Sequence, residues 1–326
     1  MTRADRLRAT IAREPVDRPA VALWRHFPVD DQDADTLTAT LLAFQAEHDF
    51  DWVKVTPASS YSVRDWGVVD DWQGDPEGTR AYTGRVIDEP KDWLRLSPLA
   101  PRQGALGEHL RCLQQVVEGL RGEVPVVATV FSPLSLAKHL AGQERLFEHL
   151  HRSPVEVQIG LKTLSDSTVA FVEAAASVGV SGIFYALQHA SYAFFDRAAY
   201  GRFGEVYDRQ ILQEAQGLWL NVLHLHGESL MFDLASEYPV QVVNWHDRHT
   251  APSLAEGLER VRGAVCGGLR RWETMVLGDP AQVRDEALDA VRACGRRGVV
   301  IGAGCVVPIL APRANLRAAR DAAESA

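Results

Sequence analysis

The strongest constraint on the fold of this chain is its alternation of short apolar runs with longer amphipathic segments. Most of the short runs are apolar at consecutive positions, as expected for strands that are buried on both faces. The eight runs are residues 20–24, 51–57, 124–131, 181–187, 218–226, 240–246, 264–269 and 298–305. This rhythm is typical of parallel βα units, in which each strand is followed by a helix.

The segments between the runs predict the helices of such units. They carry Ala, Leu, Glu and Arg at helical spacing, with Pro near their beginnings and Gly near their ends. Eight strands with covering helices favour a closed (β/α)8 TIM barrel over an open sheet. A length of 326 residues by itself suggests two domains. Barrels reach this length with insertions, so we predict one barrel domain over residues 1–326.

Residues 58–100 do not follow the alternation. This stretch comes after the second run and holds Trp66, Trp72 and Trp93 among polar and turn-forming residues. An excursion at this point of a barrel rises over the C-terminal ends of the strands. We therefore expect residues 58–100 to cover the barrel mouth, with an inert surface elaboration as the alternative interpretation.

Composition excludes several classes of protein. Asp and Glu number 43 against 34 Lys and Arg, so the chain lacks the basic surface that nucleic acids require. No apolar run reaches the ~20 residues needed to cross a bilayer, and charges interrupt the N-terminus where a signal peptide would be apolar. Four scattered cysteines without a CxxC motif do not make a disulfide framework. We expect a cytoplasmic protein with reduced cysteines and no nucleic-acid or membrane partner.

Histidines gather where the predicted strands end. Barrel enzymes place their chemistry on the loops at the C-terminal ends of the strands. Five of the 11 histidines lie at these positions, namely His26, His189, His224, His226 and His246. The same ends carry Arg25, Gln188, Asp247 and Cys305. The pattern predicts that the functional site is built from these side chains.

Two of these histidines, His224 and His226, are spaced for a metal site. They lie two residues apart on a predicted strand, so both side chains leave the same face and can converge on one atom. Cys305, at the end of the eighth run, supplies a third ligand and leaves the open position that catalytic zinc requires. Sulfur with imidazole favours zinc over magnesium. The alternatives are histidines that hydrogen-bond a carbonyl or an anionic substrate, and a cysteine that is an inert buried thiol.

Two charged residues at the strand ends carry less specific signals. Asp247 and His246 point in opposite directions if they are neighbours on a strand. Asp247 is a candidate general base, or an orienting partner of another histidine, or the cap of the following turn. The guanidinium of Arg25 suits a carboxylate substrate, or forms an ion pair at the rim. Glycines end the last two runs, where they bind phosphate or only permit a tight turn, and no dinucleotide or P-loop motif is present.

Taken in order, the strand-end motifs resemble those of the uroporphyrinogen decarboxylase superfamily. The similarity begins with RLRATIAREPVDRPAVALWRHFP and continues through FSPLSLAKHLAG, GVSGIFYALQHA, LHLHGES, NWHDR, CGGLRRWETMVLGDP and IGAGCVVP. It covers nearly the whole chain. The resemblance implies a (β/α)8 barrel with a pocket at its C-terminal mouth, and relatives in the superfamily suggest a homodimer.

The superfamily contains two chemistries, and this chain departs from both patterns. Decarboxylases of the four-acetate tetrapyrrole carry an RQAGRY-type motif and an aspartate after the second strand. Here only Arg25 remains of that motif, and residues 52–64 hold no aspartate. The other branch comprises zinc-dependent methyltransferases that act with corrinoid proteins and bind zinc through an HxC motif and a distant cysteine.

The methyltransferase pattern falls on particular residues of this chain. The resemblance places His224 on the first ligand, His226 on the first cysteine and Cys305 on the second. An imidazole in place of a thiolate makes the site less electron-rich, so a bound substrate thiol would be more acidic but less nucleophilic. The resemblance therefore implies a divergent metal or substrate.

Our hypothesis from the sequence is a methyltransferase that binds zinc through His224, His226 and Cys305. It activates a thiol or a similar acceptor, with a corrinoid protein as partner. We expect catalytic roles in substrate positioning or proton transfer for His189, His246 and Asp247, and substrate binding by Arg25, His26 and Gln188. The alternatives are a decarboxylase of a tetrapyrrole or small pyrrole acid, and a non-catalytic protein that binds a corrinoid or small acid.

Overall fold

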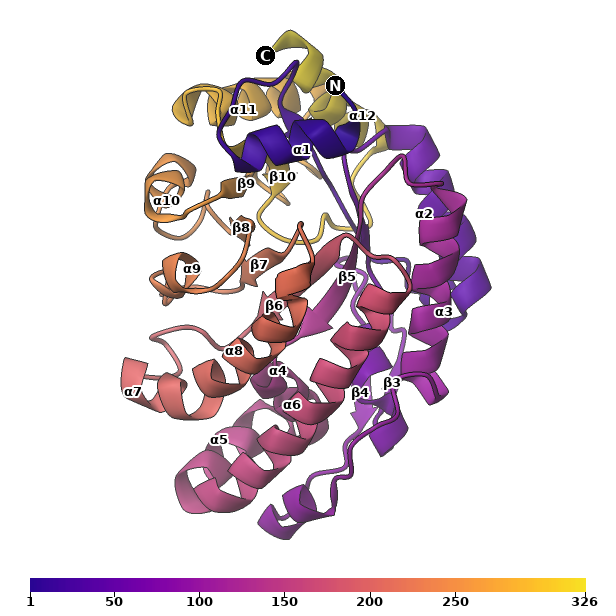
Figure 1. The fold of residues 1–326 in the computed structure, drawn as a ribbon, viewed down its shortest axis with the longest axis vertical. Coiled ribbons are helices and arrows are strands. Elements are labelled where there is room, and N and C mark those ends of the chain that lie inside the picture. Colours follow the sequence, from indigo (N-terminus) through magenta and orange to yellow (C-terminus); the bar gives the residue numbers. More distant parts are fainter.

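The computed structural model describes residues 1–326 as a curled, eight-stranded parallel sheet with helices around it (Figure 1). The strands of this sheet are β1 (Ala20–Val21), β2 (Val53–Val55), β5 (Val126–Phe131), β6 (Gly182–Leu187), β7 (Val222–Leu225), β8 (Val242–Trp245), β9 (Ala264–Leu269) and β10 (Val299–Ala303). Their order is β1-β10-β9-β8-β7-β6-β5-β2. Each of the eight apolar runs contributes one strand, which confirms the prediction of a parallel, TIM-barrel-like α/β fold.

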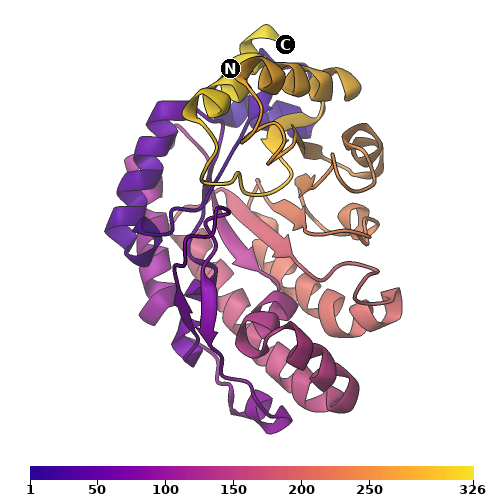
Figure 2. The same cartoon turned by 180° about the vertical axis from the view of Figure 1, so that it is seen from behind.

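Helices cover the outer face of the curled sheet, and the two termini lie at the same end of the molecule (Figures 1 and 2). The α-helices are α1 (Arg3–Ile11), α2 (Ala34–His48), α3 (Gly104–Gly119), α4 (Pro133–Ala141), α5 (Gln143–Arg152), α6 (Pro154–Ser177), α7 (Arg197–Tyr200), α8 (Val206–Glu214), α9 (Leu234–Glu237), α10 (Leu254–Arg260), α11 (Pro280–Ala293) and α12 (Arg313–Ala322). Capping boxes begin α10 at Ser253 and α11 at Asp279. None of the helices combines the length and the apolar character that a membrane span requires.

The two edge strands, β1 and β2, meet around Asp51. Its backbone N–H donates to the Val21 carbonyl at 2.8 Å, and its carboxylate accepts from the Val21 N–H at 2.7 Å. The same carboxylate, which is fully buried, also accepts from Arg6 at 2.7 Å and from Arg18 at 2.8 Å. We call Asp51, Arg6 and Arg18 the basal ion cluster. It connects the edges of the sheet at the N-terminal end of the strands.

Residues 58–100 form a folded segment on one side of the sheet, drawn in purple in Figure 2. Its elements are the 3-10 turns η2 (Ser59–Ser62), η3 (Arg64–Trp66) and η4 (Pro90–Arg95), and the antiparallel strands β3 (Val69–Asp71) and β4 (Ala81–Gly84). Arg85 donates to the carbonyl of His139 in α4 at 2.8 Å. Buried Trp93 donates to Nδ1 of His149 in α5 at 3.0 Å. The segment is therefore attached to both helices.

Alternation along the strands divides the apolar residues into two clusters. Phe184 and Ala186 of β6 belong to a small cluster inside the curled sheet, whereas Ile183, Tyr185 and Leu187 join the large core beneath the helices. The period of two in strand side chains explains this division. The inner cluster contains several small residues, among them Ala20, Ala22, Ala186 and Ala264. Small inner residues leave room for larger polar side chains at the strand ends.

Candidate metal centre and pocket

A pocket of about 440 Å³ lies at the C-terminal ends of the strands. Three of its lining residues lie on strands, Lys54 on β2, Phe184 on β6 and His224 on β7. Others lie on the loops that follow β1, β2, β6, β7 and β10, namely Trp24, His26, Thr56, Gln188, His226 and Cys305. Ser59, Glu77, Thr79, Arg80 and Tyr82 from the segment 58–100 line another part of it. Gly78, at φ +80°, lies so close to His26 that an added Cβ would stand 2.6 Å from the His26 Cβ. This glycine lets the segment approach the strand ends closely.

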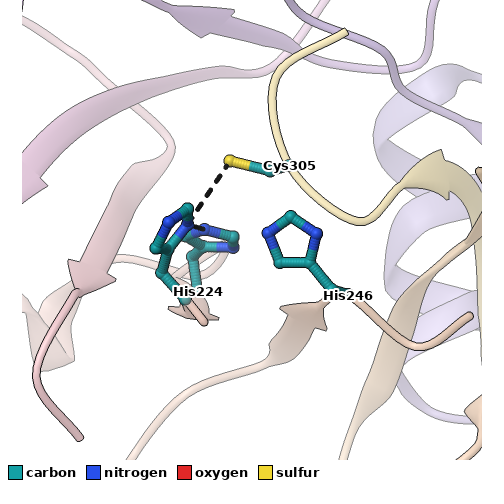
Figure 3. A group of neighbouring side chains, drawn as sticks. His224, His246 and Cys305 are labelled. Carbon is teal, nitrogen blue, oxygen red and sulfur yellow. Dashed lines mark hydrogen bonds between the residues drawn. The ribbon is translucent and has the colours of Figure 1, made fainter. Parts of the chain in front are cut away.

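Four potential metal ligands converge beside this pocket (Figure 3). The donor atoms of His224, His226, His246 and Cys305 all lie within 4.8 Å of one another. His224 Nε2 is 3.4 Å from His226 Nδ1, and Cys305 Sγ is 3.9 Å from the same His226 nitrogen. The structure thus brings together the three residues that the sequence selected and adds His246 from the end of β8. We call these four residues the His3Cys cluster.

Asn244 fixes the tautomer of His224. Its side-chain amide donates to the carbonyls of Cys266 at 2.9 Å and Ala303 at 3.0 Å, so its Oδ1 is the acceptor for His224 Nδ1 at 2.7 Å. The proton of a neutral His224 must then be on Nδ1, which leaves Nε2 free as a ligand atom. Asn244 is itself fully buried on β8, where sequence reasoning did not single it out. Its two-residue spacing from His246 was the available signal.

The electrostatics of the His3Cys cluster suit a metal ion. Burial alone would raise the pKa of the Cys305 thiol, but hydrogen bonding and charge from the surrounding imidazoles bring it well below its usual range. Burial lowers the pKa of His224, although the Cys305 thiolate opposes that shift. For His246, burial acts downward, and the thiolate raises its pKa overall. The cluster therefore offers one thiolate and a neutral, correctly oriented imidazole at His224, as metal ligation requires.

Two lysines of the pocket were not among the predicted site residues. Lys54, 5% exposed on β2, donates to Thr56 Oγ1 at 3.2 Å, and burial lowers its pKa to about 7. Lys138 on α4 donates to Gln188 Oε1 at 2.7 Å, and burial lowers its pKa to about 8. Lys54 has the strand parity of Trp52 and Thr56, which was the sequence signal for its inward position.

Strand parity also corrects the expected places of three residues, Arg25, His189 and Asp247. None of them lines the pocket. The Arg25 guanidinium lies over the ring of Phe27, with 5.1 Å to its centroid, and belongs to the packing against α2. Each of the three follows an inward-facing neighbour by one residue, so it points toward the helices. The roles expected for them, substrate binding by Arg25 and catalysis by His189 and Asp247, therefore remain predictions for side chains outside the pocket, whereas His26 and Gln188 do line the pocket.

The surroundings of His189 and Asp247 show what these two side chains do instead. His189 Nε2 lies 3.2 Å from Gln143 Oε1 of α5. The Asp247 carboxylate accepts the backbone N–H of Gly268 at 3.1 Å, at the end of β9. Burial raises the pKa of Asp247 to about 6. His189 therefore contacts an outer helix, and Asp247 contacts the backbone of the neighbouring strand.

Comparison with known proteins identifies the family. The family model described as uroporphyrinogen decarboxylase (URO-D) matches residues 75–326. Among curated proteins, the methylcobamide:CoM methyltransferase MtbA of Methanosarcina acetivorans is 22% identical over 339 residues, covering 97% of this chain and 96% of that protein. A solved methyltransferase from Methanosarcina mazei has a TM-score of 0.83 at 18% identity and covers 98% of both chains.

A more distant solved structure shares the architecture. The B12-independent methionine synthase from a Shewanella species has a TM-score of 0.60 at 11% identity, covering 90% of this chain and 86% of its own. At such identities the structural likeness establishes the fold alone. The family model, in contrast, spans most of this chain. The protein is therefore a member of the uroporphyrinogen decarboxylase family.

Proposed function

We propose that this protein is a metal-dependent methyltransferase that moves a methyl group between a corrinoid on a partner protein and a thiol or similar small acceptor. The observation that carries the proposal is the His3Cys cluster, whose four donor atoms lie within 4.8 Å of one another beside the pocket. The similarity to the methylcobamide:CoM methyltransferase of M. acetivorans supports the same reaction class and a corrinoid partner.

The donor set fits zinc. One thiolate and several imidazoles are borderline-soft ligands that zinc accepts in tetrahedral sites. When bound, the ion would lower the pKa of a coordinated acceptor and so supply the nucleophile. His224, His226 and Cys305 would hold the ion, and Asn244 keeps His224 in the ligating tautomer.

Of the four donors, His246 is the one that we expect to give up its place to the substrate. A catalytic zinc site keeps one position for substrate, so one of four protein donors must yield. His224 is held by Asn244, and His226 Nδ1 lies next to both His224 Nε2 and Cys305 Sγ, which leaves His246 as the donor with the fewest such contacts. With a single thiolate in the set, the acceptor would be more acidic and less nucleophilic than in a two-cysteine site.

The segment 58–100 completes the proposed site as a cover over the mouth of a single domain, residues 1–326. Five of its side chains line the pocket, and the Gly78 turn packs directly on His26. Trp24 and Phe184 form an aromatic part of the pocket wall, and Phe184 packs against the ring of His224. Such a wall excludes water from a reacting thiolate, which would otherwise be solvated and less reactive.

Decarboxylation of a pyrrole acid receives no comparable support. The one carboxylate that lines the pocket, Glu77, is occupied by an ion pair with Arg271 and by a hydrogen bond from Trp272 Nε1 at 2.7 Å. No free carboxylate is therefore available as a counter-charge for a cationic pyrrole.

Metal analysis combined with a methyl-transfer assay tests the proposal. We expect one zinc ion per chain in protein purified without chelator, and loss of that ion in His224→Ala and Cys305→Ser. Methylcobalamin would serve as donor and 2-sulfanylethanol as acceptor, with loss of methylcobalamin absorbance as the readout. Two substitutions outside the His3Cys cluster serve as controls. His151→Ala removes an exposed histidine of α5, and Cys294→Ser replaces another free cysteine.

Three outcomes would contradict the proposal. Protein without stoichiometric metal whose activity survives His224→Ala would reject the metal-dependent mechanism. Conversion of uroporphyrinogen without metal would favour a decarboxylase. Binding of cobalamin with no turnover of any thiol would favour a non-catalytic binding protein.

A further inference from the structure

Another pocket, of about 230 Å³, lies between α2, α3 and the turns η2 and η3. It shares only Pro57 with the pocket at the mouth of the barrel. Arg64 is the one Lys or Arg among its lining residues, whereas four carboxylates line it, namely Asp31, Asp33, Asp65 and Glu108. Much of the remaining wall is apolar, and includes Ala34, Leu37, Ala58, Tyr61 and Ala105. We call this cavity the lateral pocket.

Three of the four carboxylates have partners that explain their presence. Asp33 caps α2, where it accepts two backbone N–H groups of the first turn. Asp65 accepts the backbone N–H of Ala105 at the start of α3, at 2.9 Å. Glu108 pairs with Arg111 one turn further along the same helix, at 2.9 Å. None of these three residues therefore indicates a ligand.

Asp31 differs from them because one of its carboxylate oxygens has no partner. Its side chain is 1% exposed, and its Oδ1 accepts from Gln32 at 2.6 Å. Its Oδ2 is buried without a hydrogen bond, and the closest guanidinium, that of Arg80, lies 4.0 Å from Oδ1. Burial raises the pKa of Asp31 to about 6, although Gln32 and Arg80 act in the opposite direction. A buried carboxylate oxygen that lacks a donor is costly, and a ligand with N–H groups would remove that cost.

His109 brings a second unpartnered atom to the wall of the lateral pocket. The residue is 4% exposed, and its Nε2 is buried without a partner. Its ring stacks on Phe171 with 5.7 Å between centroids, and the centroid of Tyr61 lies 4.4 Å away. Burial lowers the pKa of His109 to about 3, so the imidazole is neutral and one of its two nitrogens is an acceptor.

This lining suits an organic cation better than a metal ion. Metal sites need several donor atoms that converge on one point. The His3Cys cluster is the one place where three or more His, Cys, Asp or Glu ligand atoms converge, and neither Asp31 nor His109 belongs to such a group. An ammonium group needs fewer acceptors, and the apolar wall accommodates the hydrocarbon body that a metal ion lacks.

We infer that the lateral pocket binds a small organic cation, whose ammonium N–H groups donate to Asp31 Oδ2 and whose hydrocarbon body packs on the apolar wall. The site is separate from the His3Cys cluster, and the inference does not depend on methyl transfer.

NMR titration of the full-length protein, labelled with 13C at its alanine methyl groups, tests the ligand class and the location together. Ala34, Ala58 and Ala105 line the lateral pocket, whereas Ala186 lines the pocket at the mouth. The probe is propylammonium, and propan-1-ol, propanoate and Mg²⁺ are the controls. We expect propylammonium alone to shift the three lateral methyl signals along a saturable curve, with no shift at Ala186.

Substitutions then test the contacts. Asp31→Asn removes the charge at nearly constant volume, so we expect it to weaken propylammonium binding at least tenfold. Asp71→Asn removes an exposed carboxylate outside the pocket and should change the affinity less than twofold. Ala105→Phe is a second variant, since it fills the pocket from a half-buried position without removing a polar group, and it should abolish binding. Circular dichroism checks that each variant is folded.

Three results would overturn the inference. The first is a wild type without a saturable shift at the lateral alanines, or with the same affinity as Asp31→Asn. The second is saturable binding of Mg²⁺ or propanoate in place of propylammonium, which would reject the ligand class. The third is a propylammonium shift at Ala186 alone, which would place the cation at the mouth.

Discussion

At the N-terminal end of the strands the charged side chains form ion pairs with one another, whereas at the C-terminal mouth two lysines, Lys54 and Lys138, have no ion-pair partner. A hollow of about 740 Å³ at the N-terminal end is lined by Arg3, Arg6, Arg18, Arg320, Asp17, Asp49 and Glu324 among others, and these residues form mutual ion pairs. The pocket at the mouth instead holds Lys54 and Lys138, which have no ion-pair partner, and the His3Cys cluster.

The difference separates charges whose desolvation cost is offset within the fold from charges whose cost is not. Both ends bury ionisable groups at a desolvation cost. In the basal ion cluster, the protein itself offsets that cost with Asp51. At the mouth, Lys54 has a hydroxyl acceptor but no carboxylate that would offset the cost. Four substitutions would break or sharpen this comparison, and they follow from the largest expected effect to the smallest.

Asp51→Ala tests whether the basal ion cluster stabilises the fold. The substitution leaves Arg6 and Arg18 buried without their shared carboxylate, so we expect the free energy of unfolding to fall by about 3–5 kcal/mol. Urea denaturation followed by circular dichroism measures it. Asp166→Ala, which removes an exposed pair with Lys162, should cost about 0.5 kcal/mol or less. Equal losses in the two variants would contradict the comparison.

Asn244→Ala tests the orientation of the metal ligand. Without the Asn244 amide, the His224 ring is free to rotate and to change tautomer, so we expect zinc affinity to fall by about 10- to 100-fold. Competition with a chromophoric chelator measures that affinity. Cobalt substitution provides a second readout, because a distorted site changes its visible absorption. Unchanged affinity with an unchanged cobalt spectrum would show that Asn244 does not position His224.

Lys54→Met tests whether the mouth carries a stability cost. We expect the variant to be more stable than the wild type by about 1–3 kcal/mol near pH 6, since it removes a buried charge. Burial lowers the folded-state pKa of Lys54 from 10.5 to about 7. Between these values the unfolded chain holds the extra proton, so wild-type stability rises with pH and the advantage of the variant shrinks.

Thermal unfolding of both proteins between pH 6 and pH 9 measures this effect. The Cys305 thiolate is the charged group that favours the protonated amine, so the comparison is repeated in Cys305→Ser. A variant that is less stable than the wild type at pH 6 would mean that Lys54 has a partner within the fold.

Arg25→Ala should have the smallest effect on binding. Its guanidinium packs on Phe27 and Phe44 outside the pocket, so we expect KM for the thiol acceptor to change less than threefold. Kinetics of methyl transfer from methylcobalamin to 2-sulfanylethanol measure it. A tenfold rise of KM in Arg25→Ala would support the substrate-binding role that the sequence suggested for Arg25.

The strands and the spacing of the β7 histidines could be predicted from the sequence because both depend on local patterns. Apolar runs mark strands that are buried on both faces, and all eight appear in the sheet. Residues 224 and 226 share a face because strand side chains alternate with a period of two. The same rule, applied to Arg25 and His189, predicts that their side chains point away from the pocket.

The remaining features of the site depend on contacts between distant strands. Cys305 follows β10, His246 follows β8, and Asn244 of β8 contacts His224 of β7. These side chains can meet only because the sheet curls and brings the ends of its strands together. The absence of a carboxylate partner for Lys54 likewise depends on the tertiary structure, in which Glu77, the one carboxylate of the pocket, pairs with Arg271. The sequence by itself determined which residues form strands and which face each side chain takes, because these are properties of neighbours along the chain. Only the tertiary structure decided which of those side chains meet, and which buried charges have no partner within the fold.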